Sequence, residues 1–163
     1  MLIRRARIDD AEDISKLCAE LNVTRSSSAR TGFVEHAPSP EEFRRRIIGN
    51  PLFFTAYEHH ELAGFVAAYR DDRMPEEDIT KALDTKERPF VYCELLGVKE
   101  GYRGLGKILV QYLFDHSRGP YWSATVCAPR RNRPAEALLR LTGWKPEQKV
   151  ESDGLTFQFY RHE

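Results

Sequence analysis

The sequence predicts one domain spanning residues 1–163, of the α/β (α+β) class, with six to seven strands and about four helices. The 163 residues, 41% of them hydrophobic, have the size and composition of a single folded domain. Two pairs of short apolar runs are each joined by a polar turn, as in β-hairpins. Four further segments repeat apolar residues at helical spacing.

The N-terminal third predicts a strand, two helices and a loop between them. Residues 1–8 are a β-like run, and an amphipathic helix capped by an aspartate follows over residues 9–21. Residues 23–37 contain three consecutive serines and no apolar period, which indicates a loop. Ser39 is expected to cap a short second helix, because Pro40 then stands at the first helical position.

The middle of the chain predicts a hairpin and then a buried strand. Residues 51–57 and 62–69 are aromatic and β-branched runs, and the polar residues 58–61 between them indicate a hairpin turn. Residues 71–88 are acidic and aperiodic, so we expect a loop that can hold a helical turn. Residues 89–98 form an almost unbroken apolar strand, of the kind that is buried on both faces of a sheet.

The last third predicts a helix, a strand, a helix and a second hairpin. Residues 105–113 carry one apolar helical face, and residues 121–128 form a strand. Asn132 is expected to cap a helix that ends at Gly143. Two strands, residues 144–150 and 155–161, then close the chain around a turn at residues 152–154.

Charge and cysteine content argue against several classes of function. The 25 Lys and Arg balance the 25 Asp and Glu, so no global basic field favours nucleic acid or an anionic membrane. Cys18, Cys93 and Cys127 are odd in number and far apart, which fits free thiols and gives neither a disulfide framework nor a zinc site. No apolar run reaches the roughly 18 residues of a membrane span, and the N-terminus is charged. We therefore expect a cytoplasmic protein without a bound metal.

The segment between the buried strand and the next helix, residues 101–107, has the sequence GYRGLGK. Small residues let backbone N–H groups converge at the positive end of a helix, an arrangement that suits phosphate oxygens. A nucleoside-triphosphate P-loop would need Ser or Thr where Ile108 stands, and a dinucleotide fingerprint would need glycine at Leu109. Both patterns are therefore incomplete, and a P-loop nucleotide hydrolase is the weakest alternative.

A third pattern fits better. The run VKEGYRGLGKIL resembles the acetyl-coenzyme-A signature of the GNAT family of N-acetyltransferases, Q/R-x-x-G-x-G/A. Arg103 and Gly106 take the first two fixed places, and Ile108 departs from the third. Residues 132–144, NRPAEALLRLTGW, resemble the family's second motif, in which N-x-x-A is followed by a helix and G-F. The order of elements agrees over nearly the whole chain.

The resemblance implies a mixed, mostly antiparallel central sheet and direct transfer of an acetyl group from acetyl-coenzyme A (acetyl-CoA) to a primary amine. The amine would belong to a small molecule, a peptide N-terminus or a lysine. The main chain of the strand would hold the pantetheine arm, and a splayed strand would offer an N–H to the thioester oxygen. The residues implied in cofactor binding are Leu96, Gly97, Val98, Arg103, Gly104, Leu105, Gly106, Lys107, Ile108, Asn132 and Ala135. Gly97 also indicates a bulge or a close backbone approach within its strand.

Glu94 is the best candidate for the general base, because it is the only charged residue within FVYCELLGV and burial raises the pKa of a carboxyl group. Pairing with a buried arginine is the structural alternative. The family often protonates the leaving thiolate with a tyrosine seven residues after the motif asparagine, where this chain has Leu139. Cys127 and Tyr160 are weaker candidates, and water can also protonate a thiolate whose pKa resembles that of cysteine, about 8.5.

Charge is unevenly distributed along this neutral chain. Residues 99–149, which hold both motifs, carry ten basic and four acidic residues, which suits an anionic nucleotide. Residues 50–98 carry five basic and ten acidic residues, which would favour a cationic acceptor. The three arginines at residues 44–46 are expected on the solvated face of their helix. A non-catalytic acyl-CoA-binding module of the same fold stays open, as does the choice between monomer and homodimer.

Overall fold

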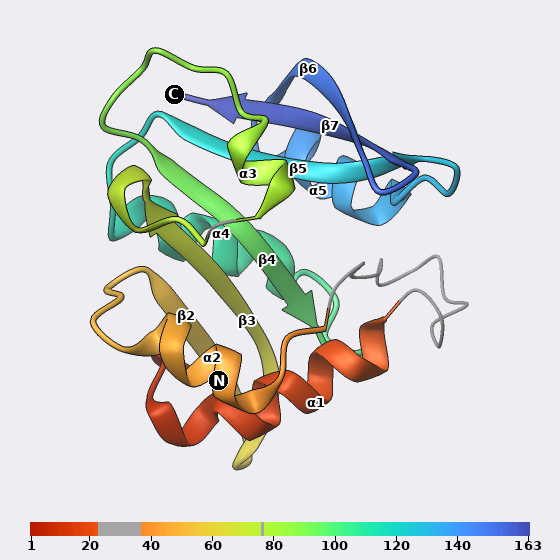
Figure 1. Cartoon of the computed structure of the whole chain (residues 1–163). Coiled ribbons are helices and arrows are strands. Elements are labelled where there is room, and N and C mark those ends of the chain that lie inside the picture. The colour runs from red at the N-terminus through yellow and green to blue at the C-terminus, as the bar shows by residue number, and fades with distance from the viewer. Residues whose placement is uncertain (23–36, 76) are drawn as a thin grey trace.

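The computed structural model describes residues 1–22, 37–75 and 77–163, and shows a seven-stranded sheet with helices on both faces (Figure 1). The strands are β1 (Leu2–Arg5), β2 (Phe53–Glu58), β3 (Glu61–Arg70), β4 (Val91–Val98), β5 (Tyr121–Ala128), β6 (Lys145–Ser152) and β7 (Leu155–His162). The helices are α1 (Ala11–Leu21), α2 (Pro40–Ile47), α3 (Asp78–Lys81), α4 (Leu105–Asp115) and α5 (Arg133–Leu141), with 3₁₀ turns at Ile8–Asp10 and Asp71–Arg73. The predicted fold class is confirmed. The loop expected over residues 23–37 lies outside the described residues except for residue 37.

The sheet has the strand order β1-β2-β3-β4-β5-β7-β6. Neighbouring strands are antiparallel except β4 and β5, which are parallel. These two strands pair only where residues 91–93 face residues 121–123, and beyond that point they diverge (Figure 1). The sheet is therefore divided into two halves, and the C-terminal end of β4 faces the opening between them.

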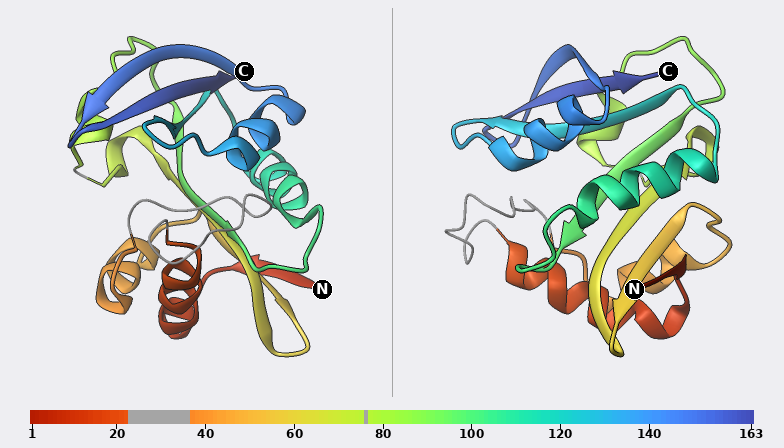
Figure 2. Two further views of the ribbon diagram at one scale, coloured as in Figure 1. Left: turned by 90° about the vertical axis from the view of Figure 1, so that its right-hand side faces the viewer. Right: turned by 180° about the vertical axis from the view of Figure 1, so that it is seen from behind.

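Helices cover both faces of the sheet (Figure 2). On one face, α1 and α2 enclose a core in which the rings of Phe43, Phe53 and Phe65 meet at centroid distances of about 6 Å. On the other face, α4 and α5 pack on a second core. As predicted, Ser39 caps α2, because its hydroxyl accepts a hydrogen bond from the Glu42 N–H at 3.2 Å. Within the described ranges, every helix is too short or too polar to cross a bilayer.

Both predicted hairpins are confirmed, and each is closed by a two-residue turn. His59 and His60 join β2 to β3 with φ values of 50° and 65°, and Asp153 and Gly154 join β6 to β7 with φ values of 51° and 74°. Consecutive positive φ values are typical of the type I′ turn, whose twist matches that of paired strands. The polar turn residues therefore set the strand pairing next to each turn, and each hairpin has one register shift farther along its strands.

A bulge in β4 falls at Glu94. Ala67 of β3 faces Leu95 and Ala68 faces Cys93, so Glu94 is the extra residue on β4. Cys93 and Leu96 pack toward α4 and α5, whereas Leu95 packs toward α1 and α2. The bulge therefore places Glu94 and Leu95 on the same face, that of α1 and α2, and reverses the alternation of the strand from Leu95 onward. At Gly97, where the sequence indicated either a bulge or a close backbone approach, β4 pairs with Phe65 in regular register, so the bulge alternative does not apply there.

Candidate active site

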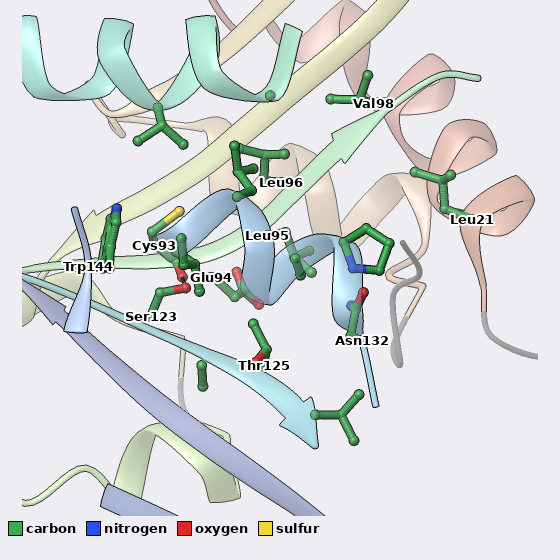
Figure 3. Close-up of a pocket in the computed structure, with 18 of the residues that line it drawn as sticks. Leu21, Cys93, Glu94, Leu95, Leu96, Val98, Ser123, Thr125, Asn132 and Trp144 are labelled. Atoms are coloured by element: carbon green, nitrogen blue, oxygen red, sulfur yellow. Dashed lines mark hydrogen bonds between the residues drawn. The ribbon is translucent and has the colours of Figure 1, made fainter. Parts of the chain in front are cut away.

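A cavity of about 1010 Å³ lies where β4 and β5 diverge (Figure 3). Both strands line it, together with the glycine-rich turn and the first turn of α5. Eight of the predicted site residues are among the lining residues, namely Glu94, Leu96, Val98, Arg103, Gly104, Gly106, Asn132 and Ala135. The fold thus brings the two sequence motifs and the predicted base to one cavity.

The exposed edge of β4 presents backbone groups to this cavity. The Lys99 N–H donates to the Ala63 carbonyl of β3 at 2.8 Å. Because the peptide groups of a strand point alternately to its two sides, those of Leu96 and Val98 point away from β3 and toward the opening. Their N–H groups therefore stand where the sequence predicted hydrogen-bond donors for the pantetheine arm or the thioester oxygen.

Gly97 does not line the cavity, and the need for glycine at this position has a steric cause. A Cβ atom built at Gly97 would lie 2.5 Å from the buried ring of Phe65, which is closer than carbon atoms can approach. The backbones of β3 and β4 also approach each other closely, because a Cβ atom built at Gly64 of β3 would lie 2.9 Å from the Gly97 carbonyl oxygen. The predicted close approach is therefore to Phe65 and β3, and the prediction that Gly97 contacts the cofactor gains no support.

The turn between β4 and α4 depends on left-handed backbone at Gly104, with φ of 84°. Gly104 and Gly106 line the cavity, and the first N–H groups of a helix have no acceptor within the helix. Leu105 is buried in the core, whereas the side chains of Lys107 and Ile108 are exposed outside the cavity. The side chains of Leu105, Lys107 and Ile108 thus lie outside the cavity lining, so the departure at Ile108 leaves that lining unchanged.

Helix α5 closes the other side of the cavity. The Asn132 N–H donates to the Val126 carbonyl at 3.1 Å, which fixes the start of α5 against β5. Asn132 does occupy the N-cap position, but its side chain makes no capping hydrogen bond, contrary to the sequence prediction. Gly106 allows α4 to approach α5, since a Cβ there would lie 3.1 Å from Leu138. Leu139 lines the cavity at the place of the family's tyrosine.

Glu94 is buried and paired. Its side chain is 6% exposed, and one carboxylate oxygen contacts the Nη1 atom of Arg46. Arg46 is itself only 9% exposed, so its expected place on the solvated face of α2 is wrong, whereas Arg44 and Arg45 are exposed as expected. Glu94 thus both lines the cavity and pairs with a buried arginine. The position expected of a general base and the structural ion pair, which the sequence offered as alternatives, therefore occur together.

Burial raises the pKa of Glu94, and the nearby charge of Glu77 raises it further, while Arg46 opposes both effects. A carboxyl group with a raised pKa accepts a proton more readily near neutral pH than a solvated one does. The combination of desolvation, a specific charged partner and a cavity is typical of functional carboxylates.

The two weaker candidates for the general acid, Cys127 and Tyr160, are not among the residues that line the cavity. Tyr160 belongs to the core below α5, where burial raises its pKa. The geometry therefore does not support either as the acid. On strand β5, two polar side chains that the sequence did not single out, Ser123 and Thr125, also line the cavity. Nothing distinguishes them in the sequence from other strand residues.

Thr125 is buried, and its Oγ1 atom has no hydrogen-bond partner among the described residues. Ser123, by contrast, donates to the Cys93 carbonyl at 2.8 Å and so links β5 to β4 where they still pair. No group of three His, Cys, Asp or Glu side chains in the described ranges is placed to hold a metal ion.

Comparison with known proteins agrees with this geometry. Residues 19–144 match the acetyltransferase (GNAT) family. Solved structures with the same fold include a GNAT acetyltransferase from Streptococcus agalactiae 2603 (TM-score 0.72, 18% identity, 99% of this chain and 95% of that chain covered) and an N-acetyltransferase from Staphylococcus aureus Mu50 (0.68, 16%, 99% and 100%). Naa20 from Chaetomium thermophilum, in complex with a bisubstrate analogue, is also similar (0.71, 14%, 99% and 85%). The search of curated protein sequences found no match.

The family match covers about three quarters of the chain and includes both the glycine-rich turn and the α5 motif. Strands β4 and β5, which diverge to form the opening, lie within the matched residues. The chain belongs to the acetyltransferase (GNAT) family.

Proposed function

We propose that this protein is an N-acetyltransferase that moves an acetyl group from acetyl-CoA to a primary amine, with Glu94 as the general base. The observation that carries this proposal is a buried carboxyl group, of raised pKa, that lines the same cavity as the glycine-rich turn and the free edge of β4. We infer that it acts in the cytoplasm, in keeping with its three free cysteines.

Acetyl-CoA supplies an acetyl group activated as a thioester. The N–H groups at the start of α4 would bind its pyrophosphate, with the Arg103 side chain beside them. Leu96 and Val98 would hold the pantetheine arm through their backbone. The unpartnered hydroxyl of Thr125 also fits a polar ligand in the cavity, because a buried polar group without a hydrogen bond is costly.

The reaction needs a neutral amine, and an alkylammonium with a pKa near 10.4 is mostly charged at neutral pH. Glu94 would take that proton. The amine nitrogen then bonds to the carbonyl carbon, whose oxygen accepts a hydrogen bond from the Leu96 or Val98 N–H. The carbon–sulfur bond breaks, the second proton of the nitrogen passes to the thiolate directly or through water, and the products are an amide and the free thiol. One proton is released in total.

The function is tested by incubating the protein with acetyl-CoA and a panel of primary amines while following release of the thiol. We expect at least one amine to give saturable, enzyme-dependent release. Leu139, which lines the cavity where the family often has a tyrosine, favours a second candidate, the non-catalytic acyl-CoA-binding module. Tight acetyl-CoA binding without thiol release for any amine would support that candidate instead.

The cavity is expected to prefer an acceptor with a second positive charge. Glu77 and Glu94 both line it, and both contact the single cation Arg46, so carboxylate charge is in excess at this end. Naa20 and NAA60, the latter from Arabidopsis thaliana, were each crystallised in complex with a bisubstrate analogue. Peptide amines stay within the proposed class of acceptors.

A diamine should therefore show a KM at least about tenfold lower than that of a monoamine of the same chain length, because the monoamine lacks one favourable charge contact with the cavity. Steady-state kinetics at low and high salt check this, since added salt should reduce the difference. Equal KM values for the two amines would contradict a cationic acceptor.

Replacing Gly104 with Val should raise the KM for acetyl-CoA by about tenfold or more. A β-branched residue at φ of 84° is strained by roughly 1–2 kcal/mol, and the added side chain would stand at the cavity wall. Gly154→Val is the matched control, because Gly154 has φ of 74° and equally open surroundings but lies in the β6–β7 turn outside the cavity. Both variants should lose similar stability, and only Gly104→Val should bind acetyl-CoA poorly. A similar rise in the KM for acetyl-CoA in both variants would show that backbone strain, and not the position of Gly104 in the cavity wall, causes the change.

A further inference from the structure

Arg46 connects Glu94 to a second carboxylate. Its Nη1 atom contacts Glu94, and its Nη2 atom lies 2.9 Å from an oxygen of Glu77. Side-chain exposure rises along this pair, from 6% at Glu94 to 29% at Glu77. Two carboxylates on neighbouring nitrogens of one guanidinium are held close together. A buried charge is thereby linked to one that reaches solvent.

Glu77 also stands between two cavities. A second cavity of about 510 Å³ lies beside α2, and its lining includes Arg46, Tyr69 and Arg73. Of the described residues that line these two cavities, Glu77 is the one they share. A proton on Glu77 can thus leave on the α2 side, away from the space that the substrates would occupy.

The other titratable groups whose pKa is affected by the charge of Glu94 are poor proton acceptors. They are Cys18 of α1, Tyr69 of β3 and Tyr92 and Cys93 of β4. Burial raises the pKa of both thiols to about 12 and raises the pKa of both phenols further, so all four keep their protons at neutral pH. Arg46 is already protonated. Among the described side chains near Glu94, Glu77 is therefore the one placed to receive its proton.

We propose that Glu77 and Glu94 form a carboxyl pair bridged by Arg46, in which Glu94 takes the proton of the acceptor ammonium and Glu77 passes it to solvent. The inference rests on the proposed acetyltransferase function and extends it. The ammonium becomes a neutral amine as Glu94 becomes a carboxylic acid. Glu94 then returns to a carboxylate as Glu77 is protonated, and Glu77 gives the proton to water or a buffer base. Glu77 is a positioning residue that acts through Glu94.

The test compares Glu77→Gln with Glu42→Gln. Glu42 also faces Arg46, at 3.8 Å from its Nε atom, but it does not line the cavity of Glu94, so its loss removes a similar charge outside the pair. We expect Glu77→Gln to lower kcat about tenfold at low buffer concentration, and a small diffusible base such as imidazole to restore it to within about twofold of the parent. Glu42→Gln should keep the parent's kcat and show no response to imidazole.

A second measurement needs no substrate. In protein with ¹³C-labelled glutamate carboxyl groups, NMR titration should show the Glu94 transition moving to lower pH in Glu77→Gln, because a neighbouring negative charge that raises its pKa is gone. The acidic limb of kcat/KM should move in the same direction.

An unchanged kcat in Glu77→Gln, or a loss that imidazole does not restore, would overturn the relay. An unmoved Glu94 titration would overturn the pair. If the parent acetylates no amine while the titration shifts as expected, the proposed function fails and the carboxyl pair stands, so the two failures are distinguishable.

Discussion

Replacing Glu94 with Gln is expected to lower kcat by about 10²–10³-fold at neutral pH, while acetyl-CoA binding stays within about twofold. The amide keeps the size of the side chain and its contact with Arg46 but cannot accept a proton. Removal of a positioned general base typically costs 10²–10⁴-fold in rate. Thiol release measures kcat, and calorimetric titration with acetyl-CoA measures binding.

The pH dependence separates a base from a structural partner of Arg46. A base is needed only while the acceptor is protonated, so the ratio of parent to variant rates should shrink as the pH approaches about 10. Because burial raises the pKa of Glu94, the parent should lose activity as the pH falls through that raised value. A ratio that stays constant from neutral to alkaline pH would show that Glu94 does not act as the base.

Replacing Gly97 with Ala is expected to lower the free energy of unfolding by about 2–4 kcal/mol, a large effect for one added methyl group. The new Cβ would lie 2.5 Å from the Phe65 ring, which is fully buried and held between Phe43 and Phe53. Relief would require the β3–β4 pairing or all three rings to move. Urea denaturation measures the change.

The matched test is a double-mutant cycle with Phe65→Leu, which removes the ring edge that the methyl group would strike. Phe65→Leu alone leaves a cavity in the α1–α2 core and should also destabilise. The two changes together should cost less than their sum, by roughly 1–2 kcal/mol. Additive effects would show that the loss at Gly97 comes from its strand conformation and not from Phe65.

Sequence patterns predicted the elements of this fold well, because strands, caps and turns are local. Strand β5 has the predicted bounds, and Ser39 caps α2 through a residue only three positions away. The glycine-rich turn was recognised because left-handed backbone and helix starts have their own residue types. Glu94 was found because a single charge interrupts an apolar strand.

The surroundings of Glu94 could not be predicted in the same way. Arg46 lies 48 residues from Glu94 and 31 from Glu77, so no local pattern relates them. Arg46 is one of three consecutive arginines, and only the position of α2 against the sheet decides which of them is buried. Gly97 likewise depends on Phe65, whose ring comes from another strand. Contacts between distant segments settle these details.

The divergence of β4 from β5 has a mechanical consequence. It places an edge strand in the interior of the sheet, whereas edges normally lie at the rim, where they invite pairing with other chains. If the pantetheine arm pairs with this edge, the substrate takes the place of a missing strand and joins the two half-sheets. The free energy of unfolding would then increase with the ligand concentration [L] by RT ln(1 + [L]/Kd). The two half-sheets would therefore be held together more firmly when the acyl donor is abundant.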